Sequence, residues 1–378
     1  MIHLYEENIE LARNWLLNSG IQNLGEIRDI EGTNLNGSFN SWLDLNTNKY
    51  PFAYSEITGY AITTLLFLNH IEKNQEYLKR AKLAADWLIN IKQNNIFPSI
   101  FSITNHNFQH RKDLAYLFDI GMVLNGLTNK YKATKEEKYL QESKKIANWF
   151  LELQKEDGSL PAIYNFKKNQ IEDTDETWST HSGSYHAKNS IGLINLYDIT
   201  KDQKYKNTAI KLCNYALTQQ KENGRFTSHI EGGTNLHPHC YSAEGLLCTG
   251  IYLNKQDYIN SAVKATEWIL KNEKDNKIPR LYTTIFNYNQ RNDVLAQSLR
   301  LTIFLQKMGY LQEYKTKTTK LLKKLIEFQH EQGGFMFGLD TNGNKLNHIN
   351  AWTTMFALQA LILHENEIRK EDIARFLV

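Results

Sequence analysis

The chain has 378 residues, and its 44 basic and 41 acidic side chains almost balance. A net charge of +3 gives no broad positive surface for a nucleic-acid backbone, so nucleic acid is not an expected partner. Apolar residues make up 41% of the chain and aromatic residues 12%, which is enough for a hydrophobic core and argues against a disordered chain.

Signals for membranes and secretion are missing from the sequence. No segment approaches the roughly 18 consecutive apolar residues that a membrane-spanning helix needs. Residues 1–17 carry acidic side chains where a secretory signal would carry Lys or Arg. Cys213, Cys240 and Cys248 are an odd number at spacings that suggest no disulfide framework. We therefore expect a soluble, cytoplasmic protein without a membrane span.

A repeat organises the chain from one end to the other. Each copy is a helical segment, and most copies run on into a polar turn. Trp87, Trp149, Tyr215 and Trp268 occupy one equivalent position in four of the copies. In chain order, the copies are ARNWLLNSG (12–20), ADWLINIKQ (85–93), ANWFLELQKEDGSL (147–160), NYALTQQKENGRF (214–226), TEWILKNEKDNKI (266–278) and KKLIEFQHEQGGF (323–335).

Six further apolar helices alternate with these copies. Several of them are apolar or small on all sides, as buried helices must be. A short polar turn and an amphipathic helix follow each one, for instance at 69–81 and 197–209. The pattern therefore predicts six inner and six outer helices. The inner helices begin near Ser55, Asp113, Ser184, Cys240, Asp293 and Asn350.

Twelve helices in such pairs can close into a ring or stack into an open solenoid. A solenoid needs polar capping repeats, and neither terminal copy is polar, so we expect an all-α ring that forms a single domain over 1–378. Closure would place the N-terminal helix near 3–20 beside the last inner helix near 350–364. The remaining helical segment, 371–378, is expected to pack on the rim.

This pattern resembles the six-hairpin (α/α)6 toroids over nearly the whole chain. Three segments also look like uncharacterised toroid proteins of polysaccharide biosynthesis clusters: FDIGMVLNGL (118–127), ANWFLELQKEDGS (147–159) and SYHAKNSIGLINLYDITKDQKY (184–205). The resemblance implies a glycan-acting protein, since the superfamily contains glycoside hydrolases, polysaccharide lyases and sugar epimerases. It also contains prenyltransferase subunits and terpenoid and lanthionine cyclases, so the fold does not settle the reaction.

The loops that enter the inner helices are long, whereas the opposite turns are short, and long loops are often functional. A ring gathers the inner-helix N-termini at one end, where free N–H groups favour oxygen-rich ligands. Eight of the twelve histidines lie in or near these loops, His106, His110 and His229 among them. We therefore predict a glycan-binding cleft at this end.

The candidate site residues are the acids, bases, aromatic groups and Arg near the starts of the inner helices, because sugar chemistry needs proton transfer, stacking surfaces and hydrogen bonds. The predicted catalytic residues are Glu244, His186, Glu56, Tyr185 and His239. The predicted substrate-binding residues are Tyr54, Trp42, Asp119, Trp178, Tyr241, Arg291 and Trp352.

Each candidate also has a structural interpretation. Trp42, Trp178 and Trp352 would equally pack loops onto the core. Glu56 sits at a helix start, where an acid stabilises the helix dipole. Asp119 lies among apolar residues, so its carboxyl group is either a buried structural partner or the floor of the cleft.

The HPHC segment (237–240) raises the question of zinc, which binds His and Cys side chains. No second Cys or His pair has zinc-finger spacing, and the sequence has neither a phosphate-binding loop nor a dinucleotide fingerprint. We therefore expect no metal and no cofactor.

Three functions lead at this stage, ahead of isoprenoid or peptide cyclisation, which also stays open. The first expectation is acid/base hydrolysis of an oligosaccharide or polysaccharide, which needs two carboxyl groups across one cleft. The second is uronate epimerisation or polysaccharide elimination by Tyr and His pairs with an Arg. The third is a toroid that only binds or holds a glycan. The sequence leaves the sugar, the linkage and the oligomeric state open.

Overall fold

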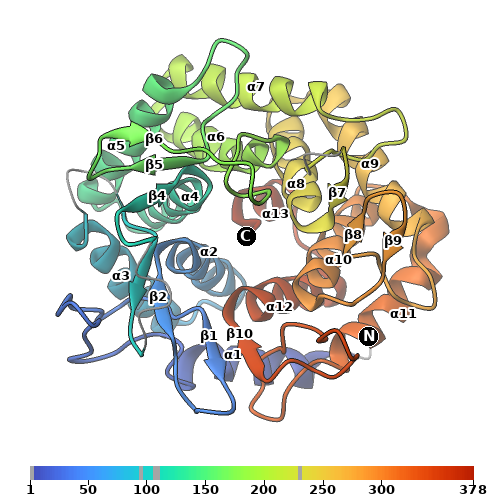
Figure 1. Ribbon diagram of the computed structural model, residues 1–378, viewed down its shortest axis with the longest axis horizontal. Coiled ribbons are helices and arrows are strands. Elements are labelled where there is room, and N and C mark those ends of the chain that lie inside the picture. Colours follow the sequence, from blue (N-terminus) through green and yellow to red (C-terminus); the bar gives the residue numbers. More distant parts are fainter. Residues whose placement is uncertain (1–3, 93–96, 105–110, 229–231) are drawn as a thin grey trace.

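The computed structural model describes residues 4–92, 97–104, 111–228 and 232–378, and in them the helices form two concentric layers around one axis (Figure 1). The six inner helices of this described part are α2 (Ser55–Glu72), α4 (Leu117–Thr134), α6 (Asn189–Thr200), α8 (Leu236–Leu253), α10 (Asn292–Lys307) and α12 (Ala351–Glu365). The outer helices are α1 (Glu6–Asn18), α3 (Gln75–Asn90), α5 (Glu137–Leu153), α7 (Gln203–Thr218), α9 (Gln256–Lys271) and α11 (Lys315–Ile326). The predicted alternation is confirmed.

The two ends of the chain close the ring. Helix α1 packs against α12, and α12 packs against α2. The strand β1 (Trp42–Asp44) pairs antiparallel with β10 (His348–Asn350), and the Asn8 side-chain amide donates a 2.6 Å hydrogen bond to Gln329. The predicted contact of the N-terminal helix with the last inner helix is therefore confirmed, and the open solenoid is wrong.

Short strands lead into most of the inner helices. The strand β2 (Phe52–Tyr54) enters α2, β4 (Leu114–Tyr116) enters α4, β7 (Thr234–Asn235) enters α8 and β10 enters α12. All of these strands pair antiparallel. The strand β2 pairs with β3 (Ile100–Ser102), and β10 pairs with β1. The strand β4 pairs with β5 (Ile163–Asn165), which continues to β6 (Gln170–Ile171), and β7 pairs with β8 (Leu281–Tyr282), which continues to β9 (Phe286–Asn287). Because the strands fix where these inner helices begin, the long entry loops gather at one end of the ring.

The polar turns of the repeat have a specific structural task. Gln220 donates hydrogen bonds from its amide to the Gly224 carbonyl at 2.8 Å and to the Ser261 carbonyl at 3.0 Å. The side chain thereby ties its own turn to the next outer helix, α9. The same two bonds are made by Gln154 to Gly158 and Thr208, and by Gln329 to Gly333 and Asn8.

The glycine in these turns is required for two reasons. Gly224 has a φ of +94°, and a Cβ added there would lie 2.4 Å from the Lys264 carbonyl oxygen. Gly343, which lies outside the repeat turns, provides a comparison. It also has a positive φ, +85°, but a Cβ there would meet nothing within 4 Å. We expect Gly343→Ala to lower the free energy of unfolding by about 1 kcal/mol through backbone strain alone. Gly224→Ala should cost about 3 kcal/mol, because the methyl group also pushes the turn away from α9.

Urea denaturation of both variants and the unmodified protein measures this difference. Equal losses for the two substitutions would show that the contact with α9 contributes nothing.

Helix α13 (Lys370–Phe376) corrects one prediction. The segment 371–378 does not pack on the rim but crosses the ring axis between the far ends of the inner helices, where Figure 1 shows the C-terminus. Phe376 and Val378 are buried, and the Gln359 amide donates a 2.9 Å hydrogen bond to the Phe376 carbonyl. The apolar side chains of this segment close the ring at the end opposite to the starts of the inner helices.

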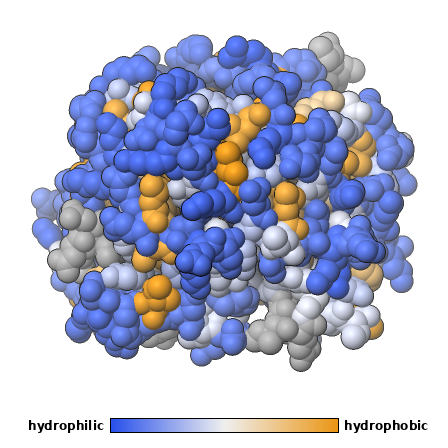
Figure 2. Space-filling view, turned by 90° about the horizontal axis from the view of Figure 1, so that it is seen from above, coloured by the Kyte–Doolittle hydropathy of each residue, from blue (hydrophilic) through white to orange (hydrophobic). Residues whose placement is uncertain are grey.

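The face of the molecule in Figure 2 is mostly hydrophilic, with small separated apolar spots. In the part of the chain that the structure describes, no helix has both the length and the apolar character needed to span a bilayer.

Candidate functional site

A cavity of about 290 Å³ opens at the end of the ring where the inner helices begin. Its walls are mainly aromatic, with two carboxyl groups and two guanidinium groups among them. The lining residues are Trp42, Phe52, Tyr54, Glu56, Ile100, Arg111, Tyr116, Phe118, Asp119, Trp178, Ser179, His237, Tyr241, Arg291 and Trp352.

Strand-to-helix junctions position the carboxyl groups. Tyr54 ends β2 in an extended conformation, and Glu56 is the second residue of α2. Tyr116 ends β4 in the same way, and Asp119 lies in the first turn of α4. Because α2 and α4 are adjacent inner helices, their first turns bring Glu56 and Asp119 to the same wall of the cavity.

The two carboxyl groups share a low-polarity environment. Burial, and then the Asp119 charge, raise the pKa of Glu56 well above its usual value. Burial raises the pKa of Asp119 to about 7, while the hydroxyl groups of Ser99 and Tyr54 limit this shift. Asp119 is 4% exposed, and its Oδ2 atom has no hydrogen-bond partner among the described residues. Burial and mutual repulsion raise the pKa of both groups, so the pair favours a state with one shared proton and one negative charge.

The opposite wall carries a histidine with fixed partners. The His237 Nδ1 atom lies 2.6 Å from Gln297 Oε1 and 3.5 Å from Asp293 Oδ2. Its Nε2 atom lies 3.1 Å from the Tyr241 hydroxyl oxygen. Burial lowers the pKa of His237 to about 4, so the imidazole is neutral at rest. The carboxylate favours a proton on Nδ1, which leaves Nε2 as an acceptor.

Asp293 is a charged structural group behind this wall. Burial opposes its ionisation, but the Arg291 guanidinium and His237 hold the pKa of Asp293 below its usual value. The Arg291 guanidinium donates two hydrogen bonds to the Asp293 carboxylate, one to each oxygen. The Trp352 indole N–H donates to Oδ2 of Asp293 at 3.2 Å. This arrangement fixes Arg291 and Trp352 at the cavity wall and neutralises the Arg291 charge.

Aromatic rings form most of the remaining surface. Trp42 meets Trp352 edge-to-face at 6.3 Å between ring centroids, and Trp178 packs edge-to-face on His237 at 5.6 Å. Flat apolar faces beside a few fixed polar groups suit a sugar ring, because its C–H face stacks while its hydroxyl groups need hydrogen bonds.

Eight of the twelve sequence-predicted site residues line this cavity in the described structure. They are Glu56 and all seven residues predicted to bind substrate: Tyr54, Trp42, Asp119, Trp178, Tyr241, Arg291 and Trp352. The other four predicted catalytic residues, Glu244, His186, Tyr185 and His239, do not line it, which corrects their predicted position.

Glu244 lies below the cavity in a buried ion cluster. Its carboxylate lies 2.5 Å from the Lys188 ammonium and 2.6 Å from the Arg300 guanidinium, and all three side chains are at most 1% exposed. Burial lowers the pKa of Lys188 to about 8, and the Glu244 charge limits the shift. With both oxygens bound to cations, Glu244 cannot contact a ligand in the cavity.

The other three are also structural in this fold. His239 accepts a hydrogen bond from the Phe226 backbone N–H at 3.1 Å, and its Nε2 atom faces the Ala265 carbonyl at 3.0 Å. Tyr185 donates to the His181 carbonyl and packs behind Trp178. His186 is 1% exposed, and in the described part of the chain neither ring nitrogen has a hydrogen-bond partner; burial lowers its pKa to about 3.

Seven lining residues were not among the predicted site residues: Phe52, Ile100, Arg111, Tyr116, Phe118, Ser179 and His237. The sequence suggested His237 as a metal candidate. Tyr60 does not line the cavity, but its hydroxyl donates a hydrogen bond to that of the lining residue Tyr241. Helical spacing was the available signal, because Tyr60 follows Glu56 by four residues and Tyr241 follows His237 by four. The loop histidines His106, His110 and His229 lie outside the described residues.

The HPHC segment does not converge on a metal position. His237 faces Gln297 and Tyr241, His239 faces backbone atoms, and Cys240 lies 3.6 Å from the Ser298 hydroxyl. Within the described ranges, no group of three or more His, Cys, Asp or Glu side chains could hold an ion.

Comparison with known proteins adds to this geometry. A family model described as β-L-arabinofuranosidase, GH127 catalytic domain, matches residues 61–241, just under half of the chain. No curated protein matches the sequence. Among solved structures, cellobiose 2-epimerase from Bacillus thermoamylovorans is 14% identical, with 93% of this chain and 98% of that chain covered and a TM-score of 0.72.

Two further structures are similar over almost their whole length. A sugar epimerase from a ruminal bacterium is 9% identical, with 96% of this chain and 100% of that chain covered and a TM-score of 0.74. An unsaturated glucuronyl hydrolase from a Bacillus species is 12% identical, with coverage of 94% and 96% and a TM-score of 0.68. The fold is an (α/α)6 toroid. The expected toroid architecture is thereby confirmed.

Proposed function

We propose that the protein is a carbohydrate-active enzyme that hydrolyses a glycosidic bond in the cavity between Glu56 and His237. The observation that carries this proposal is the carboxyl pair of Glu56 and Asp119, which lies on one wall of the aromatic cavity and not on two facing walls as expected from the sequence. Glycoside hydrolases need one protonated and one ionised carboxyl group. The different pKa shifts of Glu56 and Asp119 supply both forms near neutral pH.

In this mechanism each side chain has one task. Glu56 protonates the leaving oxygen of the glycosidic bond, and the Asp119 carboxylate activates water or stabilises the positive charge that develops on the sugar. Trp42, Trp178 and Trp352 hold the sugar ring, while Arg111 and Ser179 are available for its oxygen atoms.

The shape of the cavity supports action on the end of a glycan. Its volume of about 290 Å³ is at the small end of the range for ligand pockets, which is about 300–1,000 Å³. Buried Tyr60, Phe356 and Glu244 fill the ring below it, so a chain cannot thread through. The matched family model and the sugar-acting names of the similar structures support a glycan substrate.

Sugar epimerisation is the second candidate, and one observation favours it. Glu56 and the His237–Tyr241 pair lie on opposite walls, so they can exchange protons with opposite faces of one sugar carbon. An epimerase needs this arrangement, because one group removes a proton and the other returns one.

Product analysis on a panel of glycans tests the proposal. The panel contains arabinofuranosides, unsaturated uronides and reducing disaccharides, each incubated in D₂O and followed by NMR. Hydrolysis releases a new reducing end without deuterium on carbon, whereas epimerisation gives an isomer that carries deuterium at the inverted centre. Binding without either product would favour the non-catalytic glycan-binding toroid.

The pH dependence should follow Asp119. We expect kcat/KM to rise through about pH 7 as Asp119 ionises while Glu56 keeps its proton. Asp119→Asn should abolish this rising limb and most of the activity. Asp257→Asn, an exposed carboxylate on α9, is the matched control and should leave the profile unchanged. A rising limb that persists in Asp119→Asn would assign it to another group.

The same substitution should change stability in a defined direction. The folded-state pKa of Asp119 lies above the usual value for Asp, so the folded protein binds more protons than the unfolded chain between about pH 4 and 7. Ionisation of Asp119 therefore destabilises the fold as the pH rises through this window. Asp119→Asn should be more stable than the unmodified protein above about pH 7, as measured by urea denaturation.

A further inference from the structure

A second cavity, of about 350 Å³, lies at the opposite end of the ring from the first, between α4, α6, α8 and the segment 369–375. The α4 and α8 residues that line it belong to the last two turns of these helices, whereas the first cavity is lined by their first two turns. The two cavities share no lining residue, and the volume of the second falls within the range of ligand pockets, about 300–1,000 Å³.

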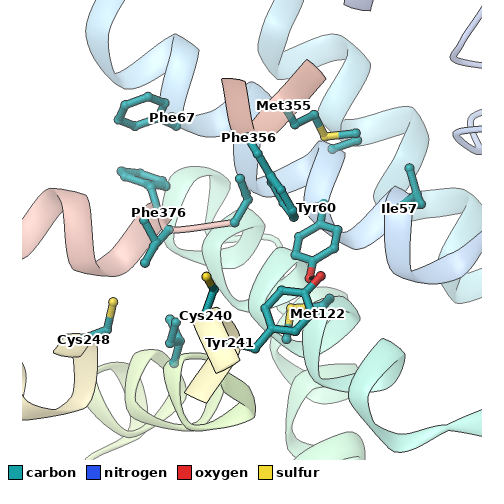
Figure 3. Close-up of a cluster of buried hydrophobic side chains, with 14 of the residues drawn as sticks. Ile57, Tyr60, Phe67, Met122, Cys240, Tyr241, Cys248, Met355, Phe356 and Phe376 are labelled. Carbon is teal, nitrogen blue, oxygen red and sulfur yellow. Dashed lines mark hydrogen bonds between the residues drawn. The ribbon is translucent and has the colours of Figure 1, made fainter. Parts of the chain in front are cut away.

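The inner surface of this second cavity is largely apolar. Ile191 and Ile194 of α6, Ile251 of α8 and Ala374 of α13 line it, and all four are buried. The free thiol of Cys248 lies on the same surface, and Figure 3 shows this side chain on α8. The cavity can therefore cover the apolar body of a small molecule.

Helix α13 forms one wall and is firmly attached to the ring. Phe376 packs against Phe67 of α2, with 6.1 Å between the ring centroids (Figure 3). The Arg375 carbonyl accepts hydrogen bonds from the side-chain amides of Asn129 and Asn195, at 3.3 and 3.2 Å. These contacts place Arg375 at a defined position on the cavity wall.

Arg375 carries a charge that the cavity leaves unpaired. Its Nε atom donates a 2.8 Å hydrogen bond to Asn129 Oδ1, and its guanidinium lies 4.5 Å from the centroid of the Phe376 ring. Among the described residues, the terminal nitrogens Nη1 and Nη2 have no hydrogen-bond partner, and the guanidinium has no ion pair. Glu371, the exposed carboxylate at the mouth, lies 4.0 Å from the Lys370 ammonium.

The two other carboxylates of the cavity are paired with other cations. Asp198 lies 2.7 Å from the Lys132 ammonium, and Asp372 lies 2.7 Å from the Arg369 guanidinium. Burial lowers the pKa of Arg375, while the charges of Asp372 and Asp198 limit this shift. An added anion would therefore compensate a charge that the fold desolvates without a direct partner.

We propose that this cavity is a second ligand site, which binds a small organic anion with a carboxylate or phosphate head and a mainly apolar body. The two terminal nitrogens of Arg375 match the oxygen atoms of either head in a bidentate arrangement. The isoleucine side chains cover the body. Inorganic phosphate has no such body, so it should bind more weakly than an organic phosphate. This site does not depend on the reaction proposed for the first cavity.

Binding should also stabilise the fold. A ligand in this cavity contacts α4, α6, α8 and α13 at once, and these contacts exist only in the folded protein. The melting temperature should therefore rise with the concentration of the organic anion.

Calorimetry and thermal melts with four probes test the site on the unmodified protein. The probes are para-bromobenzoate, phenyl phosphate, inorganic phosphate and the neutral para-bromobenzyl alcohol. At least one organic anion should bind about 10-fold or more tightly than the alcohol, because the alcohol lacks the charge-assisted hydrogen bonds to Arg375. The tighter of the two organic anions identifies the preferred head.

A crystal grown with para-bromobenzoate locates the probe through the anomalous signal of bromine. We expect the bromine among the isoleucine side chains and the carboxylate at Arg375. Binding of neither organic anion, equal binding of the alcohol, or a bromine signal only outside this cavity would each overturn the proposal.

Variants of the arginine provide a second test. Arg375→Gln should weaken binding of the preferred organic anion about 10-fold or more, and Arg375→Lys, which keeps the charge but not the bidentate geometry, should weaken it less. Arg28→Gln, at an exposed arginine between α1 and β1, is the matched control and should bind like the unmodified protein. Unchanged affinity in Arg375→Gln would overturn the site.

The first cavity provides the remaining control. Glu56→Gln should bind the organic anions with unchanged affinity, since Glu56 lines only the first cavity. Loss of anion binding in Glu56→Gln would place the anion in the first cavity and overturn the second site. Because this readout needs no turnover, the ligand site and the proposed hydrolysis fail separately.

Discussion

Replacing Glu56 by Gln should lower turnover about 10²–10⁴-fold while glycan binding persists, because general acid catalysis contributes about that much to the rate. The substitution keeps the size of the side chain. Only the transferable proton is lost. Product formation at saturating glycan and calorimetric binding measure the two quantities separately.

Glu152→Gln is the matched control for this experiment. Glu152 is an exposed carboxylate on the outer helix α5, far from the cavity lining, and its replacement should change neither quantity. If Glu56→Gln kept full turnover on the true substrate, Glu56 would not be the acid, and Asp119 would become the first candidate for that role.

The ring could be predicted from the sequence because the repeat determines how neighbouring helix pairs pack. A Gln that ties its turn to the next outer helix, as Gln220 does, forces each pair to sit beside the next. Inner helices that are apolar on all sides can only lie at the centre. The position of α13 could not be predicted, because its burial depends on hydrogen bonds between the Gln359 side-chain amide and the backbone of Phe376 and Val378, which no pattern in 371–378 reveals.

The site was predictable where residues lie at the very start of an inner helix. Glu56, Asp119 and Trp352 lie in the first turns of α2, α4 and α12, and all three line the cavity. Glu244 was placed one turn into its helix on the expectation of a start near Cys240. Helix α8 in fact begins at Leu236, so Glu244 lies about 12 Å along the axis from the first residue, too deep to reach the cavity.

A change of helix type explains the error at residues 185 and 186. Ser184–Lys188 forms a 3₁₀ helix before α6, and this helix has three residues per turn where the α-helix has 3.6. Tyr185 and His186 were predicted from their place at the start of the third inner helix, but α6 itself begins only at Asn189. Tyr185 packs edge-to-face against Trp178, and His186 is buried with no described residue that bonds its ring nitrogens.

Glu244→Gln should be a stability variant, in contrast to its predicted role in catalysis. The substitution leaves the Lys188 and Arg300 charges buried without their carboxylate, although Arg300 keeps a 3.0 Å hydrogen bond to Gln359. Breaking a buried ion cluster by removing one partner costs about 3–5 kcal/mol of unfolding free energy. Urea denaturation measures the loss, and Glu152→Gln should stay within about 0.5 kcal/mol of the unmodified protein.

The pH dependence of this loss identifies its cause. Lys188 already has a pKa of about 8 in the folded protein, below the usual value for Lys, so the folded state binds fewer protons than the unfolded chain and gains stability as the pH rises. Without Glu244 the pKa of Lys188 should fall further, and the ammonium group can discharge. The penalty of Glu244→Gln should therefore be larger at about pH 6 than at about pH 9. A penalty that is independent of pH, or one that Lys188→Met does not reduce in the double variant, would assign the loss to packing and not to the buried charge.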